Sequence, residues 1–140
     1  MKLSTTSIVI ILAATSQVAA WYVTFYDNTE RCKVDGETKY QILEGDKYDC
    51  HTFGASMDGV DCVHFVEGGR NRKGCKGLFK AQSAKPKLNT NSYCTFYPYA
   101  DCRELSIRKD PGQCATTLEM STVNGQKPDY IASFRCQNSE

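Results

Sequence analysis

The chain has 140 residues, of which 17 are basic and 16 acidic, so its formal net charge at pH 7 is +1. Because this balance is close to neutral, it excludes attraction of the whole protein to nucleic acid or to an anionic membrane as the basis of its function. The length is that of a single domain, and eight cysteines indicate a fold stapled by disulfide bonds.

The first twenty residues have the features of a secretory signal peptide. Lys2 supplies a basic start, residues 8–14 form an unbroken apolar run, and Val18-Ala19-Ala20 offers small residues before a cleavage site. The run is too short for a membrane span, which needs about 18 apolar residues. We therefore predict a signal peptide over residues 1–20 and a single secreted, extracellular β domain over residues 21–140, without a membrane span.

The even number of cysteines predicts four disulfides in an oxidising compartment. Zinc is the alternative, but zinc sites need closely clustered cysteines or histidines, and the nearest pair, Cys94 and Cys102, is eight residues apart. We expect neither a metal nor another cofactor. The residues expected to form disulfides are Cys32, Cys50, Cys62, Cys75, Cys94, Cys102, Cys114 and Cys136.

Alternating large side chains of the kinds that favour strands begin directly after the signal peptide, and no helical period competes with them. Gly68-Gly69-Arg70-Asn71 predicts a hairpin in which Cys62 and Cys75 are equally far from the centre, so that they face each other. The strands expected in the first half, residues 21–80, cover residues 21–27, 38–43, 48–53 and 60–66, with a short return strand over residues 75–80.

A segment rich in Lys, Ser and Asn, residues 81–92 with Pro86, is expected to be a linker between two halves. Asp110-Pro111-Gly112 and Asn124-Gly125 supply turns beyond it. The strands expected in the second half, residues 93–136, cover residues 93–97, 103–108, 114–119 and 130–135.

The two halves share a sequence pattern, which a duplicated unit explains most simply. The matching segments are Val23-Thr24-Phe25-Tyr26 with Cys94-Thr95-Phe96-Tyr97, each followed by a cysteine, Cys50-His51-Thr52 with Cys114-Ala115-Thr116, and Val63-His64-Phe65 with Ala132-Ser133-Phe134. Short strands, tight turns and duplication together predict an all-β fold, a β-sandwich built from two Greek-key-like halves.

The repeat also predicts how the cysteines pair. In a Greek key the fourth strand lies beside the first, which would bring the last cysteine of the second half next to its first one. The remaining cysteines of each half would then pair locally. Of the 105 possible connectivities, the repeat selects Cys94–Cys136, Cys32–Cys50, Cys102–Cys114 and Cys62–Cys75.

The doubled Thr-Phe-Tyr strand, the cysteine that follows it and the closing Phe134-Arg135-Cys136 resemble the small secreted, cysteine-rich fungal proteins whose halves are similar to βγ-crystallin Greek keys. The resemblance implies a non-enzymatic class that includes effectors, killer-toxin-like antimicrobials and some protease inhibitors. Crystallin-like domains frequently bind calcium through an Asn/Asp-rich loop, but Asp27-Asn28-Thr29-Glu30 is followed by Arg31 and Cys32, which break that motif. Calcium binding is therefore not carried over.

Charge is unevenly distributed along the chain, because residues 68–100 contain seven bases and no acid. One interpretation is a solvated, Lys-rich connector; the other is a contact surface for an anionic partner. We predict the second, since hairpin loops on a rigid scaffold are where binding groups commonly lie. Tyr99, in a loop after the second Thr-Phe-Tyr, is the best candidate for an exposed aromatic contact. The predicted partner-binding residues are Arg70, Arg72, Lys73, Lys76 and Tyr99.

No catalytic set is recognisable in the sequence. The two histidines, His51 and His64, lie in expected strands, and with all cysteines paired no thiolate remains to act as a nucleophile. We therefore predict a secreted, non-enzymatic interaction protein, a fungal effector acting on a host target. The alternatives are an antimicrobial or killer-type toxin and, less favoured, a protease inhibitor. The expected partner is a protein or an anionic surface of a host or competitor organism, bound by a monomer.

Overall fold

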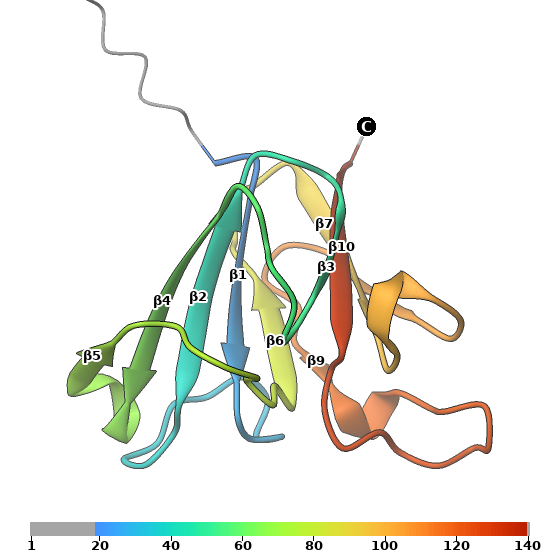
Figure 1. Cartoon of the computed structure of the whole chain (residues 1–140). Coiled ribbons are helices and arrows are strands. Elements are labelled where there is room, and N and C mark those ends of the chain that lie inside the picture. Colours follow the sequence, from blue (N-terminus) through green and yellow to red (C-terminus); the bar gives the residue numbers. More distant parts are fainter. Residues whose placement is uncertain (1–18, 140) are drawn as a thin grey trace, which may run out of the picture.

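The computed structural model describes residues 19–139, so the predicted signal peptide lies outside the described residues except for Ala19 and Ala20. Within the described part the chain is all-β and forms two sheets (Figure 1). The first sheet contains β1 (Trp21–Tyr26), β2 (Tyr40–Gly45), β4 (Val60–Val66), β5 (Asn71–Lys73), β6 (Ser83–Pro86) and β9 (Ala115–Thr116). The second contains β3 (Cys50–Thr52), β7 (Ser92–Tyr97), β8 (Ile107–Lys109) and β10 (Ser133–Asn138). Short 3-10 turns are η1 (Glu67–Gly69), η2 (Ala100–Cys102) and η3 (Thr117–Glu119).

The two halves of the chain are interleaved between the sheets. The first sheet has the order β5-β4-β2-β1-β6-β9 and the second has the order β3-β10-β7-β8, so β3 leaves the first half for the second sheet and β9 does the reverse. Four neighbouring strands of the first sheet, β2-β1-β6-β9, can be matched one by one with the four strands of the second, β8-β7-β10-β3. In each set an exchanged strand, β9 or β3, lies at the end. The β4–β5 hairpin, residues 60–73, is added outside β2 at one edge of the first sheet.

Three expectations about the middle of the chain were wrong. Residues 81–92 were expected to be a linker, yet they contain β6, which pairs with β1 and has Ser83, Ala84 and Pro86 buried. Val63-His64-Phe65 was expected to correspond to Ala132-Ser133-Phe134, but none of the residues of β4 is buried. The expected return strand over residues 75–80 is also wrong, because the hairpin returns earlier, at β5.

The register of β6 on β1 matches that of β10 on β7. Ser83 pairs with Tyr26 as Ser133 pairs with Tyr97, one residue before Ala84 pairs with Phe25 and Phe134 with Phe96. Flanking backbone hydrogen bonds repeat this match: Gln82 N donates to Tyr26 O (2.8 Å) and Ala132 N to Tyr97 O (2.9 Å). Ala81 and Ile131, which hold equivalent positions, form a bridge with each other. Such a pairing is the pattern expected at an internal two-fold axis.

The disulfides follow this interleaving. Cys62 pairs with Cys75 and Cys94 with Cys136, as expected. The local pairs Cys32–Cys50 and Cys102–Cys114 are wrong, because the structure joins Cys32 to Cys114 and Cys50 to Cys102. Cys50, in β3, lies beside the turn that follows β7, where Cys102 is found. Cys114, directly before β9, lies beside the turn that follows β1, where Cys32 is found. The predicted local pairing was therefore wrong, because these four cysteines form their bonds between the two halves.

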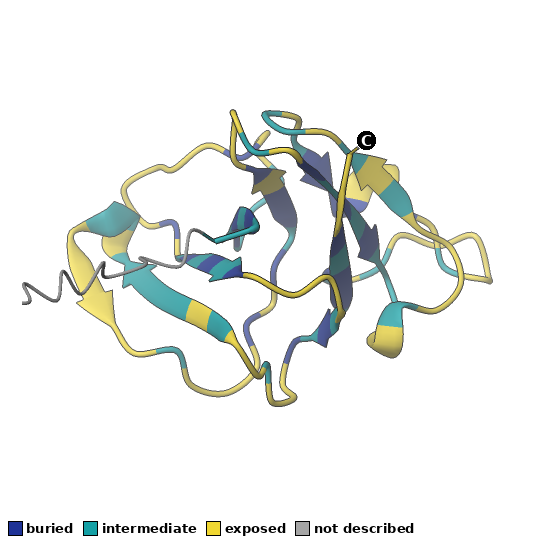
Figure 2. Ribbon diagram, turned by 90° about the horizontal axis from the view of Figure 1, so that it is seen from above, coloured by how far each residue is buried: buried dark blue, intermediate teal, exposed yellow. Residues whose placement is uncertain are grey.

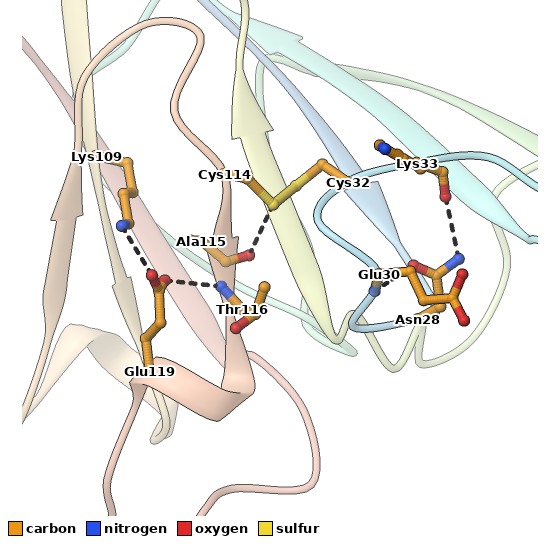
Figure 3. Close-up of a disulfide and its surroundings, with 9 residues drawn as sticks. All are labelled: Asn28, Glu30, Cys32, Lys33, Lys109, Cys114, Ala115, Thr116 and Glu119. Carbon is orange, nitrogen blue, oxygen red and sulfur yellow. Dashed lines mark hydrogen bonds and ion pairs between the residues drawn. A yellow bond between two sulfur atoms is a disulfide. The ribbon is translucent and has the colours of Figure 1, made fainter.

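The turns that receive the exchanged strands have the same backbone. Arg31 and Cys32 have φ of 54° and 58°, and Asp101 and Cys102 have φ of 64° and 52°. Around Cys32–Cys114, Asn28 organises one side by accepting from Glu30 N (3.1 Å) and donating to Lys33 O (3.2 Å) (Figure 3). The Asn28 side chain, which began the broken calcium motif, thus serves as a turn former.

The core lies between the sheets, whose buried residues are dark blue in Figure 2, and it is rich in aromatic side chains. The Phe25 ring lies 4.8 Å from that of Phe134 and 4.9 Å from that of Phe53, centroid to centroid. Trp21 is fully buried and donates its indole N–H to Lys47 O at 2.7 Å. Gly45, opposite Trp21, leaves room for the indole, since a Cβ there would lie 2.5 Å from the ring. Rings from both halves of the chain therefore share one core.

The exchanged strands make the long-range disulfides the main covalent restraint on the unfolded chain. The bridges Cys32–Cys114, Cys50–Cys102 and Cys62–Cys75 have sequence separations of 82, 52 and 13 residues. Chain entropy assigns them about 4.5, about 4 and about 3 kcal/mol of stability, respectively. We therefore expect Cys32→Ser/Cys114→Ser to lower the free energy of unfolding by about 1.5 kcal/mol more than Cys62→Ser/Cys75→Ser, as measured in urea. An equal or larger loss in the hairpin variant would contradict the exchange as the main restraint.

Candidate functional site

The β4–β5 hairpin extends beyond the second sheet. The first sheet has six strands against four, and the two additional strands lie at its β2 edge. All three residues of β5 are exposed, and Figure 1 shows β4 and β5 at the side of the molecule away from β10. The predicted basic residues Arg70, Arg72 and Lys73 are therefore presented on an edge hairpin with little other structure around them.

The tip of this hairpin is fixed by its backbone and by Arg70. Gly68 has φ of 69° and lies so close to Asp35 O that a Cβ would clash with it, which explains glycine at this position. The Arg70 side chain donates from Nε to Glu67 O (2.9 Å) and from Nη2 to Gly36 O (3.1 Å). Part of the Arg70 guanidinium is thus used to hold the tip against the neighbouring loop, which leaves Arg72 and Lys73 as the free cations of β5.

Arg72 and Lys73 face opposite sides of the sheet. Arg72 is in register with Phe65, whose ring stacks on Tyr40 at 4.9 Å with an interplanar angle of 20°. Tyr40 in turn is in register with Tyr26, 6.2 Å away. These three rings form an aromatic row (Tyr26, Tyr40, Phe65) on the outer face of the first sheet, and Arg72 extends the row at its edge.

Lys73 lies on the inner side, in register with His64. Lys73 lines one cavity together with Lys39 and Arg70, and Lys76 lines a second together with Lys39, His64 and Lys80. The Cys62–Cys75 disulfide anchors the chain between these lysines. Lys39 and Lys80 were absent from the predicted site. The sequence did contain a signal for Lys39: in a strand, the alternation Lys39-Tyr40-Gln41 places Lys39 on the face opposite to Tyr40.

The positive charges of this region are not neutralised by ion pairs. Within residues 19–139 the ion pairs are Arg103–Asp101, Arg108–Asp110 and Lys109–Glu119, all in the second half. Burial lowers the pKa of His64, and the charges of Lys39 and Lys73 lower it further, against an opposing effect of Asp27. The unpaired lysines make the inner side of the hairpin basic around His64, while Glu37 and Glu67 also line the cavity of Lys73.

Tyr99 does not belong to this group. It lies at the beginning of η2, next to the second sheet, and is half-buried. Its hydroxyl accepts a hydrogen bond from Val123 N at 3.0 Å, and its carbonyl oxygen accepts one from Ser133 Oγ at 2.5 Å. Tyr99 therefore ties the loop after η3 to the second sheet, and the structure does not bring it together with the basic hairpin.

The histidines lie on different sheets and in different environments. His51 is 5% exposed, with its ring 5.2 Å from that of Trp21 and 5.3 Å from that of Phe134, and its Nε2 is buried without a hydrogen-bond partner. His64 Nδ1 lies 3.2 Å from Gln41 Nε2. Across the part of the chain that the structure describes, no group of three His, Cys, Asp or Glu residues is arranged to hold a metal.

Comparison with known proteins gives one match. A family model described as "Secreted LysM effector LysM14, C-terminal domain" matches residues 21–136. Neither a curated protein nor a solved structure matches the chain. Among the described residues there is no helix with the length and apolar character needed to cross a membrane.

Burial of His51 gives the protein a testable pH dependence. Burial lowers the pKa of His51, with smaller opposing effects from Asp49 and Lys47, so protonation favours the unfolded chain, in which histidine titrates near about 6.5. We expect the free energy of unfolding to be constant above pH 7 and to fall as the pH decreases from about 6.5 towards 5. His51→Leu should remove the part of this slope that His51 contributes and leave the part from His64, whose pKa is lowered as well. A pKa of His51 at or above 6.5, measured by NMR in the unmodified protein, would contradict this account.

Proposed function

The chain belongs to the family of C-terminal domains of the secreted LysM effector LysM14, and on that premise we propose that it is a non-enzymatic binding domain of a fungal effector. It is secreted, as its family is. Its target is an anionic protein surface of the host, and the binding surface is the β4–β5 hairpin. Two features support this assignment: the cations Arg72 and Lys73 on an exposed edge strand, and the adjacent aromatic row.

The observation that carries the proposal is the composition of this surface. Arg72 is exposed and lies beside Phe65 and Tyr40, which are half-exposed on the outer face of the first sheet, while Tyr26 at the far end of the row is buried. Arginine and aromatic residues are those most often found to dominate binding energy at protein interfaces. The arginine also supplies bidentate hydrogen bonds to carboxylates. Since the Cys62–Cys75 bridge fixes the base of the hairpin, little conformational entropy is lost on binding.

A short edge strand with charged side chains also protects a sheet from aggregation. This role would require charge but no particular partner. The two interpretations differ in what removal of the charges changes, because a protective edge affects solubility alone, whereas a binding surface affects affinity and its dependence on salt.

We also propose that the halves derive from a duplicated Greek-key unit of the βγ-crystallin kind. The support is the common order of β2-β1-β6-β9 and β8-β7-β10-β3, together with the matched registers at Ser83 and Ser133. The hairpin would then be an addition to one half. An experimental structure in which these two sets of strands fail to superpose would contradict the duplication.

The binding proposal is tested with the double variant Arg72→Ser/Lys73→Ser. Oxidised, tagged protein is used to capture targets from host extracellular and cytoplasmic extracts, and the affinity for a captured target is then measured at several salt concentrations. We expect the variant to bind about tenfold more weakly and with a flatter salt dependence, because Arg72 faces the partner directly and Lys73, on the other side of the same edge strand, adds to the attraction for an anion. Its melting temperature should be nearly unchanged, since exposed charges contribute little to stability.

The matched control is Arg103→Ser/Lys127→Ser, which removes two exposed cations from the second half. This control should bind like the unmodified protein. Equal affinities of the hairpin variant and the control would contradict the binding proposal. The charges of the hairpin would then serve only to protect the sheet edge from aggregation. Growth inhibition of yeast or bacteria by the pure oxidised protein, without capture of a host target, would favour the toxin alternative.

A further inference from the structure

The unequal width of the sheets leaves part of the first sheet without a strand opposite it. The inner face of β2 and β4 carries Gln41 and Leu43 and, in register with them, His64 and Cys62. Opposite this face lie the segments 53–57 and 75–80, which are loops over most of their length. Two cavities occupy the space between them, and Gln41 lines both.

One of these cavities has apolar side chains in its wall, while Gln41 and backbone groups make about half of its surface polar. It has a volume of about 270 Å³ and is lined by Leu43, Phe53, Met57, Val60 and the Cys62–Cys75 bridge, with Gln41 at its border. Leu43 and Phe53 belong to the core, and Met57 and Val60 pack against it. The walls are therefore held by the fold, and a ligand entering the cavity would bury apolar surface without rearranging the core.

The adjoining cavity is basic. It has a volume of about 370 Å³ and is lined by Lys39, Lys76, Lys80, His64 and Asp27, besides Leu78, Phe79 and Gln41. The Asp27 carboxylate already accepts a hydrogen bond from Lys39 N at 3.0 Å. None of the three lysines takes part in an ion pair or a side-chain hydrogen bond within residues 19–139. Three cations therefore face one partly occupied acid, and this charge balance selects for an anion.

We propose that the two cavities form one binding site for a small amphiphilic carboxylic acid. Its apolar body occupies the cavity at Met57 and Val60, and its carboxylate lies among Lys39, Lys76 and Lys80, with the Gln41 amide between the two. The basic cavity, about 370 Å³, lies at the lower end of the range of about 300–1,000 Å³ found for small-molecule sites, and the other cavity, about 270 Å³, lies just below it, so a site of this size requires both. This inference does not depend on the proposed protein partner, because Arg72 and the aromatic row lie on the other face of the sheet.

The site is tested with three probes that separate its two parts. They are 4-phenylbutyrate, the neutral 4-phenylbutan-1-ol, which keeps the apolar body, and acetate, which keeps the charge. Binding is followed by NMR at the Met57 methyl group and the His64 ring. We expect saturable shifts with 4-phenylbutyrate and affinities at least about tenfold lower for the other two probes, since charged hydrogen bonds and apolar burial each contribute that much.

His64 supplies an independent readout of where the carboxylate lies. Its pKa is lowered by burial, by Lys39 and by Lys73, while Asp27 acts in the opposite direction. A carboxylate bound in the basic cavity favours the protonated imidazole, so 4-phenylbutyrate should raise the pKa of His64. The alcohol should leave it unchanged.

Two variants and one control complete the test. Lys39→Gln/Lys80→Gln should abolish the preference for the acid over the alcohol, and Ala55→Phe, at an exposed position that lines the apolar cavity, should block both probes. The control Lys85→Gln/Lys127→Gln removes two exposed charges elsewhere and should change nothing. The proposal is overturned by equal affinities for acid and alcohol, by an equal effect of the control, or by no saturable shift up to about 10 mM probe. Tighter binding of an acetylated Phe-Glu dipeptide than of 4-phenylbutyrate would instead assign the cavities to a protein partner.

Discussion

The exchange of β3 and β9 between the halves is the constraint on which the rest of the structure depends. Each exchanged strand pairs with the closing strand of the other half, and Cys50–Cys102 and Cys32–Cys114 hold the two exchanges covalently. Each sheet therefore ends at one edge in a strand from the other half. Phe53 follows the exchanged strand β3 and packs on Phe25 and Phe134, so the exchange completes the common core.

Most strand positions could be predicted from the sequence, because alternation of large side chains is a local signal. The strand β6 was missed since Ser83-Ala84-Lys85-Pro86 has the composition of a linker. Its small residues are required by the fold, because Ala84 and Pro86 face Phe25 and Val23 of β1 across the core side of the sheet. The disulfide exchange was missed for another reason. Which sheet a short strand such as β3 joins depends on pairing with a distant segment, and no local pattern records that choice.

The candidate site was predicted in part for the same reasons. The basic stretch was visible in composition, but only the sheet register separates Arg72 on the outer face from Lys73 on the inner face, and only the structure shows Arg70 engaged with Gly36 O. Lys39 lies thirty or more residues earlier in the chain and joins Lys76 because β2 and β4 pair. The extension of one sheet beyond the other thus creates two chemically different surfaces, an outer one of aromatic rings with an arginine and an inner one with an apolar and a basic cavity.

The central claim, that strands are exchanged between the halves and locked there, is tested most directly by peptide mapping of the secreted, non-reduced protein. Proteolysis followed by mass spectrometry should recover a peptide containing Cys32 linked to one containing Cys114, and Cys50 linked to Cys102. Recovery of Cys32 linked to Cys50 and Cys102 linked to Cys114 would contradict the exchange, because in the exchanged arrangement each of these cysteines is bonded to a cysteine of the other half.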